Sequence, residues 1–238
     1  MKQFYAALIC ALVAASAFSS SVRAQSPTSS QSAVSKPPAD PLPDPIAPEI
    51  GHRNEVGVWG GFSFGNPHLI GVTSDNQLFE AAFRYGYAVV DKRDWSFEWT
   101  VDIFPAEIVR QRAVDDVVYE GQRPVAWTYT LQHQAVYGGG INPLGIKFNL
   151  TRTRRVQPFF TSTAGFVASV KPVPIAVNGE EQFNFDFDFG GGVQLFNPSR
   201  TRAWMFGYKY KHISNAYRGE INPGVDFSVI FIGYSLLK

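Results

Sequence analysis

Apolar and polar residues alternate strictly along several stretches of this chain. From Trp95 to Ile103, one set of alternate positions carries Trp, Phe, Trp, Val and Ile, and the other carries Ser, Glu, Thr and Asp. From Phe183 to Phe189, phenylalanine alternates with Asn and Asp in the same way. Because successive side chains of a β-strand point to opposite faces, this period of two predicts strands with one apolar and one polar face.

Further segments of this kind follow one another along the chain, and several are longer than the roughly five or six residues usual in globular strands. The eight predicted strands are 54–64, 77–90, 94–104, 131–148, 156–169, 182–196, 201–214 and 225–236. Short connections, such as 91–93 and 197–200, alternate with long ones, such as 65–76 and 105–130. Short turns at one end and long loops at the other are typical of bacterial outer-membrane barrels.

These features predict an all-β fold, an eight-stranded antiparallel transmembrane β-barrel of the outer membrane. A tilted strand needs about 9–11 residues to cross a bilayer, and the predicted strands are long enough. In such a barrel the apolar faces meet lipid and the polar faces meet the lumen. A soluble eight-stranded barrel of the lipocalin type is the alternative. The ending Tyr234 to Lys238 counts against a membrane barrel, since outer-membrane barrels usually end on an aromatic residue.

The N-terminal part of the chain differs from the rest. Residues 1–24 are predicted to be a cleaved secretory signal peptide, because a positive charge precedes a short apolar stretch and small residues flank the expected cleavage site. Residues 25–50, rich in Pro and Ser, are predicted to be a linker, and 51–238 to form the barrel. The only cysteine, Cys10, lies in the predicted signal peptide, so the mature protein is expected to have neither disulfides nor thiol chemistry.

Composition narrows the classes of function. The net charge of +1 offers no general attraction to nucleic acid, so no nucleic-acid partner is expected. His52, His68 and His133 show no metal-ligand spacing, and we expect neither a metal site nor a cofactor. The glycine runs at 138–140 and 190–192 lack the Lys-Ser/Thr ending of a phosphate-binding loop and are expected to lie in strands.

The chemically distinctive residues lie in the last two predicted strands. Within 201–214, the period of two places His212 and Ser214 at the outer end of the face predicted to meet lipid. An imidazole beside a serine takes the hydroxyl proton and makes the oxygen a nucleophile. Asp226 begins the next strand, and antiparallel pairing is expected to bring its carboxylate beside His212, as a catalytic imidazole needs. The three residues predict a serine-esterase site at the outer rim of the barrel.

A His-x-Ser pair is common by chance, so simpler interpretations stay open. His212 is then an amphipathic residue at the membrane interface, Ser214 a hydroxyl at a strand end, and Asp226 a solvated loop acid. The coincidence of all three at one corner facing the membrane favours the catalytic interpretation.

The segment His212–Ala216, together with Asn222–Asp226, resembles the C-terminal signature of the lipid A 3-O-deacylases, the PagL family. Members of that family are outer-membrane barrel esterases with a His-x-Ser pair and an acidic residue twelve positions after the serine, the spacing found here. The resemblance implies that His212 is the base, Ser214 the nucleophile and Asp226 the orienting acid. It also makes Asn215 the candidate for the oxyanion site. The usual acid of the family is Glu, which is one methylene longer than Asp226.

The resemblance implies an outer-membrane hydrolase that removes an ester-linked acyl chain, at the 3-position, from lipid A. Its expected partners are the membrane itself and lipid A or lipopolysaccharide in the outer leaflet. No cofactor is expected, and whether the protein forms a homodimer is left open. Two other functions remain at this stage, a non-catalytic structural or adhesive outer-membrane barrel and a phospholipase with the same triad.

Overall fold

The structure is a computed structural model. The residues that it describes are 54–119, 127–174, 181–219, 222 and 224–238, and within 113–131 only the backbone is described. The predicted signal peptide and linker lie outside the described residues. The strands are β1 (Asn54–Gly65), β2 (Gln77–Asp91), β3 (Trp95–Tyr119), β4 (Trp127–Leu150), β5 (Val156–Ser169), β6 (Phe183–Phe196), β7 (Arg202–Ser214) and β8 (Val225–Leu237).

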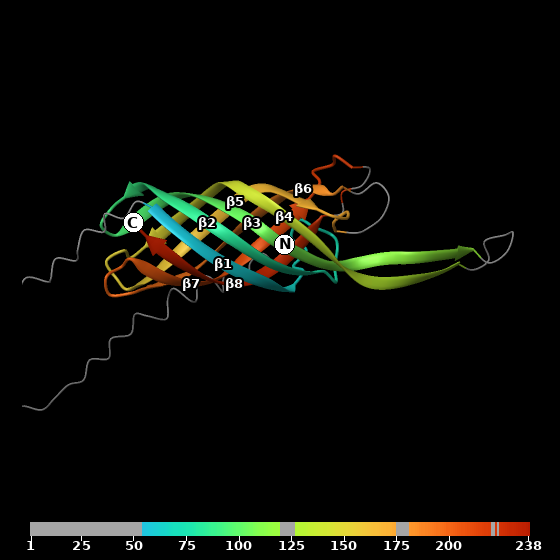
Figure 1. The fold of residues 1–238 in the computed structure, drawn as a ribbon, viewed down its shortest axis with the longest axis horizontal. Coiled ribbons are helices and arrows are strands. Elements are labelled where there is room, and N and C mark those ends of the chain that lie inside the picture. Colours follow the sequence, from blue (N-terminus) through green and yellow to red (C-terminus); the bar gives the residue numbers. More distant parts are fainter. Residues whose placement is uncertain (1–53, 120–126, 175–180, 220–221, 223) are drawn as a thin grey trace, which may run out of the picture. The chain divides into compact units, whose positions relative to one another are not determined.

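The eight strands form one closed antiparallel barrel, as predicted. Each strand pairs with the next along the chain, and β8 pairs with β1 to close the sheet (Figure 1). Seven of the pairings join strands that follow one another along the chain. Short turns connect these strands at one end of the barrel, and longer loops connect them at the other.

The prediction was wrong about the long connection at 105–130. β3 continues to Tyr119 and β4 begins at Trp127, so most of the predicted loop is strand (Figure 1). Beyond Arg110, β3 pairs only with β4, which makes this part a two-stranded ribbon. Register shifts interrupt the β3–β4 ladder at Phe104/Glu107 and at Val114/Val117. Each bulge adds a residue to one strand and resets which side chains share a face, so a strict period of two is lost there.

The inside of the barrel is polar and the outside is apolar. Outward side chains such as Val58, Phe83 and Trp204 are 48%, 57% and 51% exposed, whereas their neighbours along each strand are buried. A soluble barrel would instead present polar side chains to water on its outer face. The distribution therefore confirms the membrane barrel over the lipocalin-type alternative. No helix among the described residues is long and apolar enough to cross a membrane.

Buried ion pairs occupy much of the interior. Lys211 Nζ lies 2.7 Å from Glu80 Oε2 and 2.9 Å from Asp186 Oδ2, and all three side chains are almost completely inaccessible. Arg84 donates two hydrogen bonds to the carboxylate of Asp102. Since a buried charge is costly unless it is paired, these contacts allow the lumen to exclude water.

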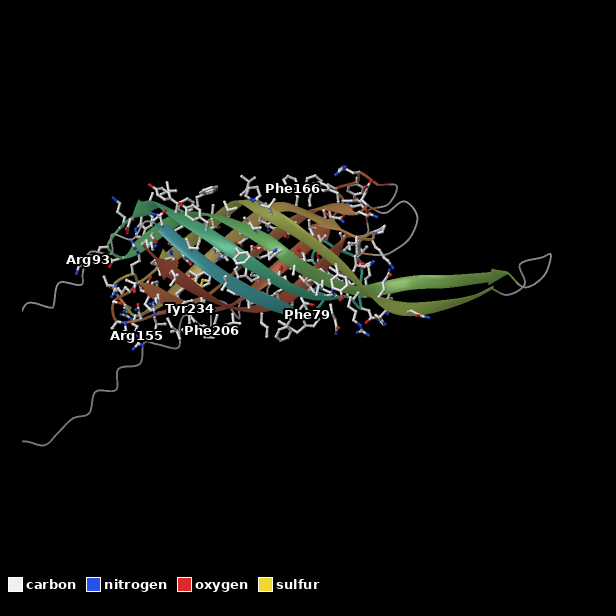
Figure 2. The ribbon with its side chains drawn as sticks, in the orientation of Figure 1. Phe79, Arg93, Arg155, Phe166, Phe206 and Tyr234 are labelled. Carbon is white, nitrogen blue, oxygen red and sulfur yellow. The ribbon has the colours of Figure 1, made fainter. Side chains whose placement is uncertain are left out.

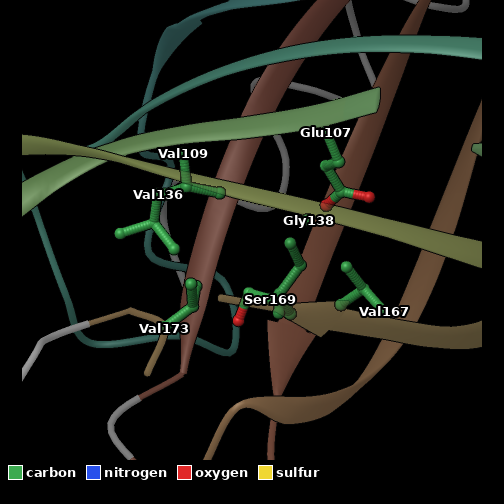
Figure 3. A pocket seen from close by; sticks show the side chains of 8 residues that line it. Glu107, Val109, Val136, Gly138, Val167, Ser169 and Val173 are labelled. Atoms are coloured by element: carbon green, nitrogen blue, oxygen red, sulfur yellow. The ribbon is translucent and has the colours of Figure 1, made fainter. Parts of the chain in front are cut away.

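Apolar side chains fill the space between the ion pairs. One cluster consists of Trp59, Ala82, Phe104, Phe159, Met205 and Phe231. A second, toward the loop end, consists of Leu78, Val109, Val136, Val167, Val173, Ile213, Val225, Phe227 and Val229. A small cavity remains between valines of the second cluster, with Glu107 and Ser169 at its edge (Figure 3). The interior of the described barrel is thus a packed core with a polar network.

Lys211→Met tests the importance of this network. The substitution leaves Glu80, Glu107 and Asp186 without their shared cation, and we expect the free energy of unfolding to fall by about 3–5 kcal/mol. Urea unfolding in lipid vesicles, followed by the faster gel mobility of the unheated folded barrel, measures the effect. The control is Lys92→Met in an exposed turn, which should change stability by no more than about 0.5 kcal/mol. Equal urea midpoints for the two variants would contradict the prediction.

Candidate functional site

His212 and Ser214 lie on the outward face of β7, at the end nearest the loops. Ile213 between them is completely buried in the interior, so the residues on either side of it face out of the barrel. The same outward face carries Trp204 and Tyr208, which are 51% and 42% exposed. The predicted assignment of faces along this strand is confirmed.

Asp226 lies directly opposite His212 in the β7–β8 ladder. Its Oδ1 atom lies 2.7 Å from His212 Nδ1, and its side chain is inaccessible to solvent. A carboxylate can only accept a hydrogen bond, so Nδ1 of the imidazole carries the proton. In the neutral ring, Nε2 then keeps its lone pair and can act as a base. The structure therefore brings together the predicted base and the predicted acid.

The β1–β2 loop folds over the Asp226 carboxylate. The N–H of Ile70 donates to Oδ2 at 2.8 Å, and the N–H of Gly71 donates to Oδ1 at 2.9 Å. Asn66 Nδ2 donates to the Asp226 carbonyl at 2.7 Å. Sequence reasoning missed this contribution, because it treated 65–76 only as an outer loop. The one local signal was a glycine, Gly71, inside an otherwise apolar stretch.

Two glycines allow the loop and the β8 turn to approach the pair closely. A Cβ atom on Gly71 would lie 2.8 Å from Asp226 Oδ1 and 2.8 Å from Val225 Cα. Gly224, just before β8, has a φ of +54°, and a Cβ there would lie 3.0 Å from His212 Cε1. Larger residues at either position would push the surrounding backbone away from the His–Asp pair.

Ser214 shares the face of His212 without bonding to it. Within the described part of the chain, no hydrogen bond joins Ser214 Oγ to the imidazole. In the β6–β7 ladder, Ser214 lies opposite Phe185, and His212 lies opposite Phe187. The predicted nucleophile and the predicted base therefore occupy successive outward positions of β7, two residues apart.

Asn215 organises the turn after β7. It is 1% exposed, its N–H donates to Asn222 Oδ1 at 3.2 Å, and its Oδ1 accepts the N–H of Tyr217 at 2.9 Å. Ala216 and Tyr217 adopt left-handed backbone conformations, with φ of 52° and 62°. The contact between Asn215 and Asn222 places an amide oxygen against the N–H that directly follows Ser214, which the sequence did not predict.

The far end of the β1–β2 loop is tied to the base of the β3–β4 ribbon. Asp75 Oδ2 accepts a hydrogen bond from Arg112 Nε at 2.8 Å and lies 3.0 Å from His133 Nε2. These two contacts lower the pKa of the Asp75 carboxyl below its usual range. His133 thus contacts the β1–β2 loop at Asp75.

Apolar side chains border the site on two sides. On β6, Phe187 is 39% exposed, and the ring of Phe189 lies 5.0 Å from the ring of Tyr210. On the β1–β2 loop, Ile70 and Val72 are 57% and 72% exposed. The His–Asp pair therefore lies between two surfaces suited to hydrocarbon.

The described residues include no group of His, Cys, Asp and Glu side chains that could hold a metal ion. The chemistry that the arrangement itself offers is proton transfer by an imidazole, which Asp226 holds in one tautomer beside a serine.

A known protein family matches more than half of this chain. Residues 93–235 match the family model described as lipid A 3-O-deacylase (PagL). The crystal structure of the outer membrane enzyme PagL is similar, with a TM-score of 0.51, at 13% identity over 75% of this chain and 97% of that chain. The crystal structure of Neisserial surface protein A (NspA) has a TM-score of 0.44, at 10% identity over 77% of this chain and 96% of that one. No curated protein sequence matches.

Gly71→Ala tests whether the loop holds the acid. The added Cβ would meet Asp226 Oδ1 and the β8 backbone, so we expect stability to fall by about 1–3 kcal/mol and the His212–Asp226 hydrogen bond to lengthen. The bond can be followed through the low-field proton NMR signal of the His212 Nδ1–H in protein labelled at histidine. Gly65→Ala is the matched control, because a Cβ there meets nothing within 4 Å. If the NMR signal of Gly71→Ala is the same as that of the unmodified protein, the loop does not position the acid.

Proposed function

This chain belongs to the lipid A 3-O-deacylase (PagL) family, and on that premise we propose that it is a serine esterase that cleaves the acyl ester at the 3-position of lipid A. Membership makes it an outer-membrane lipid A deacylase. The serine mechanism, the position cleaved and the residue roles are our proposal. The observation that carries them is the hydrogen bond between His212 Nδ1 and Asp226 Oδ1, which lies on the same outward face as Ser214.

The proposed reaction proceeds through an acyl-enzyme. Ser214 Oγ attacks the acyl carbonyl carbon while His212 Nε2 takes the hydroxyl proton. The tetrahedral intermediate then expels the sugar oxygen, which receives that proton from His212, and the acyl chain stays on Ser214. Water, deprotonated by His212, attacks the acyl-enzyme, and the fatty acid leaves as Ser214 regains its proton.

The separation of Ser214 from His212 is compatible with this role. Side chains two apart on one strand face can converge through their rotamers. Catalytic hydrogen bonds in unliganded enzymes are often long and shorten when substrate binds. Because Asp226 already holds Nδ1, the imidazole needs only its Nε2 side to meet the serine.

Asp226 is suited to the orienting role in spite of its short side chain. It lies directly opposite His212, so no extra methylene is needed to reach the imidazole. The N–H groups of Ile70 and Gly71 bind its two oxygens and keep the carboxylate ionised and fixed in direction.

Asn215 is proposed to help stabilise the oxyanion. Its N–H directly follows the nucleophile and already binds an acceptor, Asn222 Oδ1. An oxyanion is a stronger acceptor than a neutral amide oxygen, so the N–H can turn to it as charge develops.

The surroundings favour an amphiphilic substrate. Exposed Phe187 on one side and exposed Ile70 and Val72 on the other allow acyl chains to remain in hydrocarbon while the ester reaches Ser214. A glycerophospholipid shares these properties, so a phospholipase with the same triad is the second candidate.

Ser214→Ala and His212→Asn should fold and insert normally but abolish release of the acyl chain. Each variant removes one partner of the proton transfer. The measurement is the mass spectrum of lipid A incubated with the purified barrel, alongside glycerophospholipid as the competing substrate. Ser228→Ala serves as the control, because Ser228 lies on the outward face of β8 and bonds only Tyr208 in the described chain.

A fluorophosphonate probe should label the unmodified protein and Ser228→Ala, but not Ser214→Ala. Normal deacylation by Ser214→Ala would rule out the serine mechanism. Faster release from glycerophospholipid than from lipid A would favour the phospholipase. An unmodified protein that neither reacts with the probe nor releases fatty acid would be a non-catalytic barrel.

Two substitutions of Asp226 test the charge of its side chain and the length of its side chain separately. Asp226→Asn removes the charge that fixes the tautomer of His212, and we expect the deacylation rate to fall by about 10²–10⁴-fold. Asp226→Glu keeps the charge but displaces it from the N–H groups of Ile70 and Gly71, and a loss of roughly tenfold is expected. Initial rates of deacylation of purified lipid A measure the effect of each substitution. An Asp226→Glu enzyme faster than the original would mean that the loop contacts do not tune this acid.

A further inference from the structure

Positively charged side chains gather at the turn end of the barrel, opposite the candidate site. They come from the β2–β3 and β4–β5 turns, the start of β7 and the end of the chain. The exposed members, here called the basic rim, are Lys92, Arg93, Arg154, Arg155, Arg202 and Lys238.

Few negative charges balance the basic rim. Of the acids in these turns, Asp91 already forms an ion pair with the buried Arg152. Asp94 is then the one exposed acidic side chain without an ion pair among the described turn residues, and the α-carboxylate of Lys238 adds one more negative charge, against six exposed cations. The rim therefore carries a net positive charge that the protein itself does not neutralise in its described part.

The turns that carry the basic rim are tied to one another. The guanidinium of Arg200 donates to the carbonyls of Arg152 and Thr153, and so joins the β6–β7 turn to the β4–β5 turn. Arg155 Nε donates to the carbonyl of Phe196 at 2.8 Å. These bonds hold the backbone of the rim in place and so keep its cations together at one end of the barrel.

Aromatic side chains place the basic rim at the level of lipid headgroups. The rings of Trp204 and Tyr234 lie 5.0 Å apart on the outward surface, close to the turns. Aromatic residues of this kind settle at the boundary between hydrocarbon and headgroups. Figure 2 shows Arg93 and Arg155 at the same end of the barrel as Tyr234. The cations thus stand where phosphates of the nearby leaflet lie.

We propose that the basic rim binds the phosphate groups of anionic glycerophospholipids. The leaflet concerned is the periplasmic one, because the candidate site at the opposite end faces the leaflet that holds lipid A. Guanidinium groups bind phosphate oxygens through paired hydrogen bonds, and cations near a membrane surface are attracted to anionic lipid. This second lipid contact is separate from the substrate and involves neither Ser214 nor His212.

The test compares two triple variants of the full chain in vesicles of equimolar phosphatidylcholine and phosphatidylglycerol. Arg93→Gln/Arg154→Gln/Arg202→Gln removes three cations of the basic rim and spares Arg155, whose side chain bonds a backbone carbonyl. Arg110→Gln/Lys171→Gln/Arg218→Gln removes three exposed cations at the loop end and changes the net charge equally. Electron spin resonance of spin-labelled lipids measures the association of each lipid with the barrel, and gel mobility verifies folding.

The unmodified protein should associate with phosphatidylglycerol at least about twofold more strongly than with phosphatidylcholine, and salt should reduce the difference. The rim triple variant should lose most of this preference, whereas the loop-end triple variant should keep it. Equal association of the two lipids with the unmodified protein would overturn the proposal. An equal loss in both triple variants would overturn it as well, because the preference would then follow net charge alone.

Discussion

The hydrogen bonds between β8 and β1 close the sheet, and every other feature of this protein depends on that closure. Hydrocarbon offers no partners for backbone N–H and C=O groups, so only a barrel without free edges is stable in it. Closure also fixes which side of each strand faces out. Once Ile213 occupies the interior, His212 and Ser214 must face the membrane. The alternation of side chains along β7 therefore determines where the candidate site lies. It places polar residues on the outer face, at positions where the barrel otherwise presents aromatic rings.

The two faces of β7 support one another. On the inner side, Lys211 is bound by Glu80 and Asp186, which belong to β2 and β6. On the outer side, the next residue, His212, binds Asp226 of β8. The buried ion pairs therefore hold the strand in the register that the site requires. Ion pairing in the lumen and the geometry of the His212–Asp226 pair are thus linked, because Lys211 and His212 are adjacent residues of one strand.

Local pattern was enough to predict most of the fold and one contact of the site, the one between His212 and Asp226. The period of two located the strands, and the expected antiparallel pairing of the last two strands made it possible to predict Asp226 beside His212. The β3–β4 ribbon was missed because bulges such as Phe104/Glu107 reset the period. The loop contacts to Asp226 were missed for another reason. Gly71 lies 155 residues from Asp226, and a backbone N–H carries no sequence signal of what it will bind.

The β1–β2 loop has a consequence for how this enzyme can be handled. Its backbone N–H groups hold the Asp226 carboxylate, while its Ile70 and Val72 side chains project where hydrocarbon lies. Outside a bilayer those side chains gain by folding back upon protein, and the N–H groups would leave the acid with them. Lipid that covers Ile70 and Val72 would therefore help to keep the loop, and with it the Asp226 carboxylate, in place.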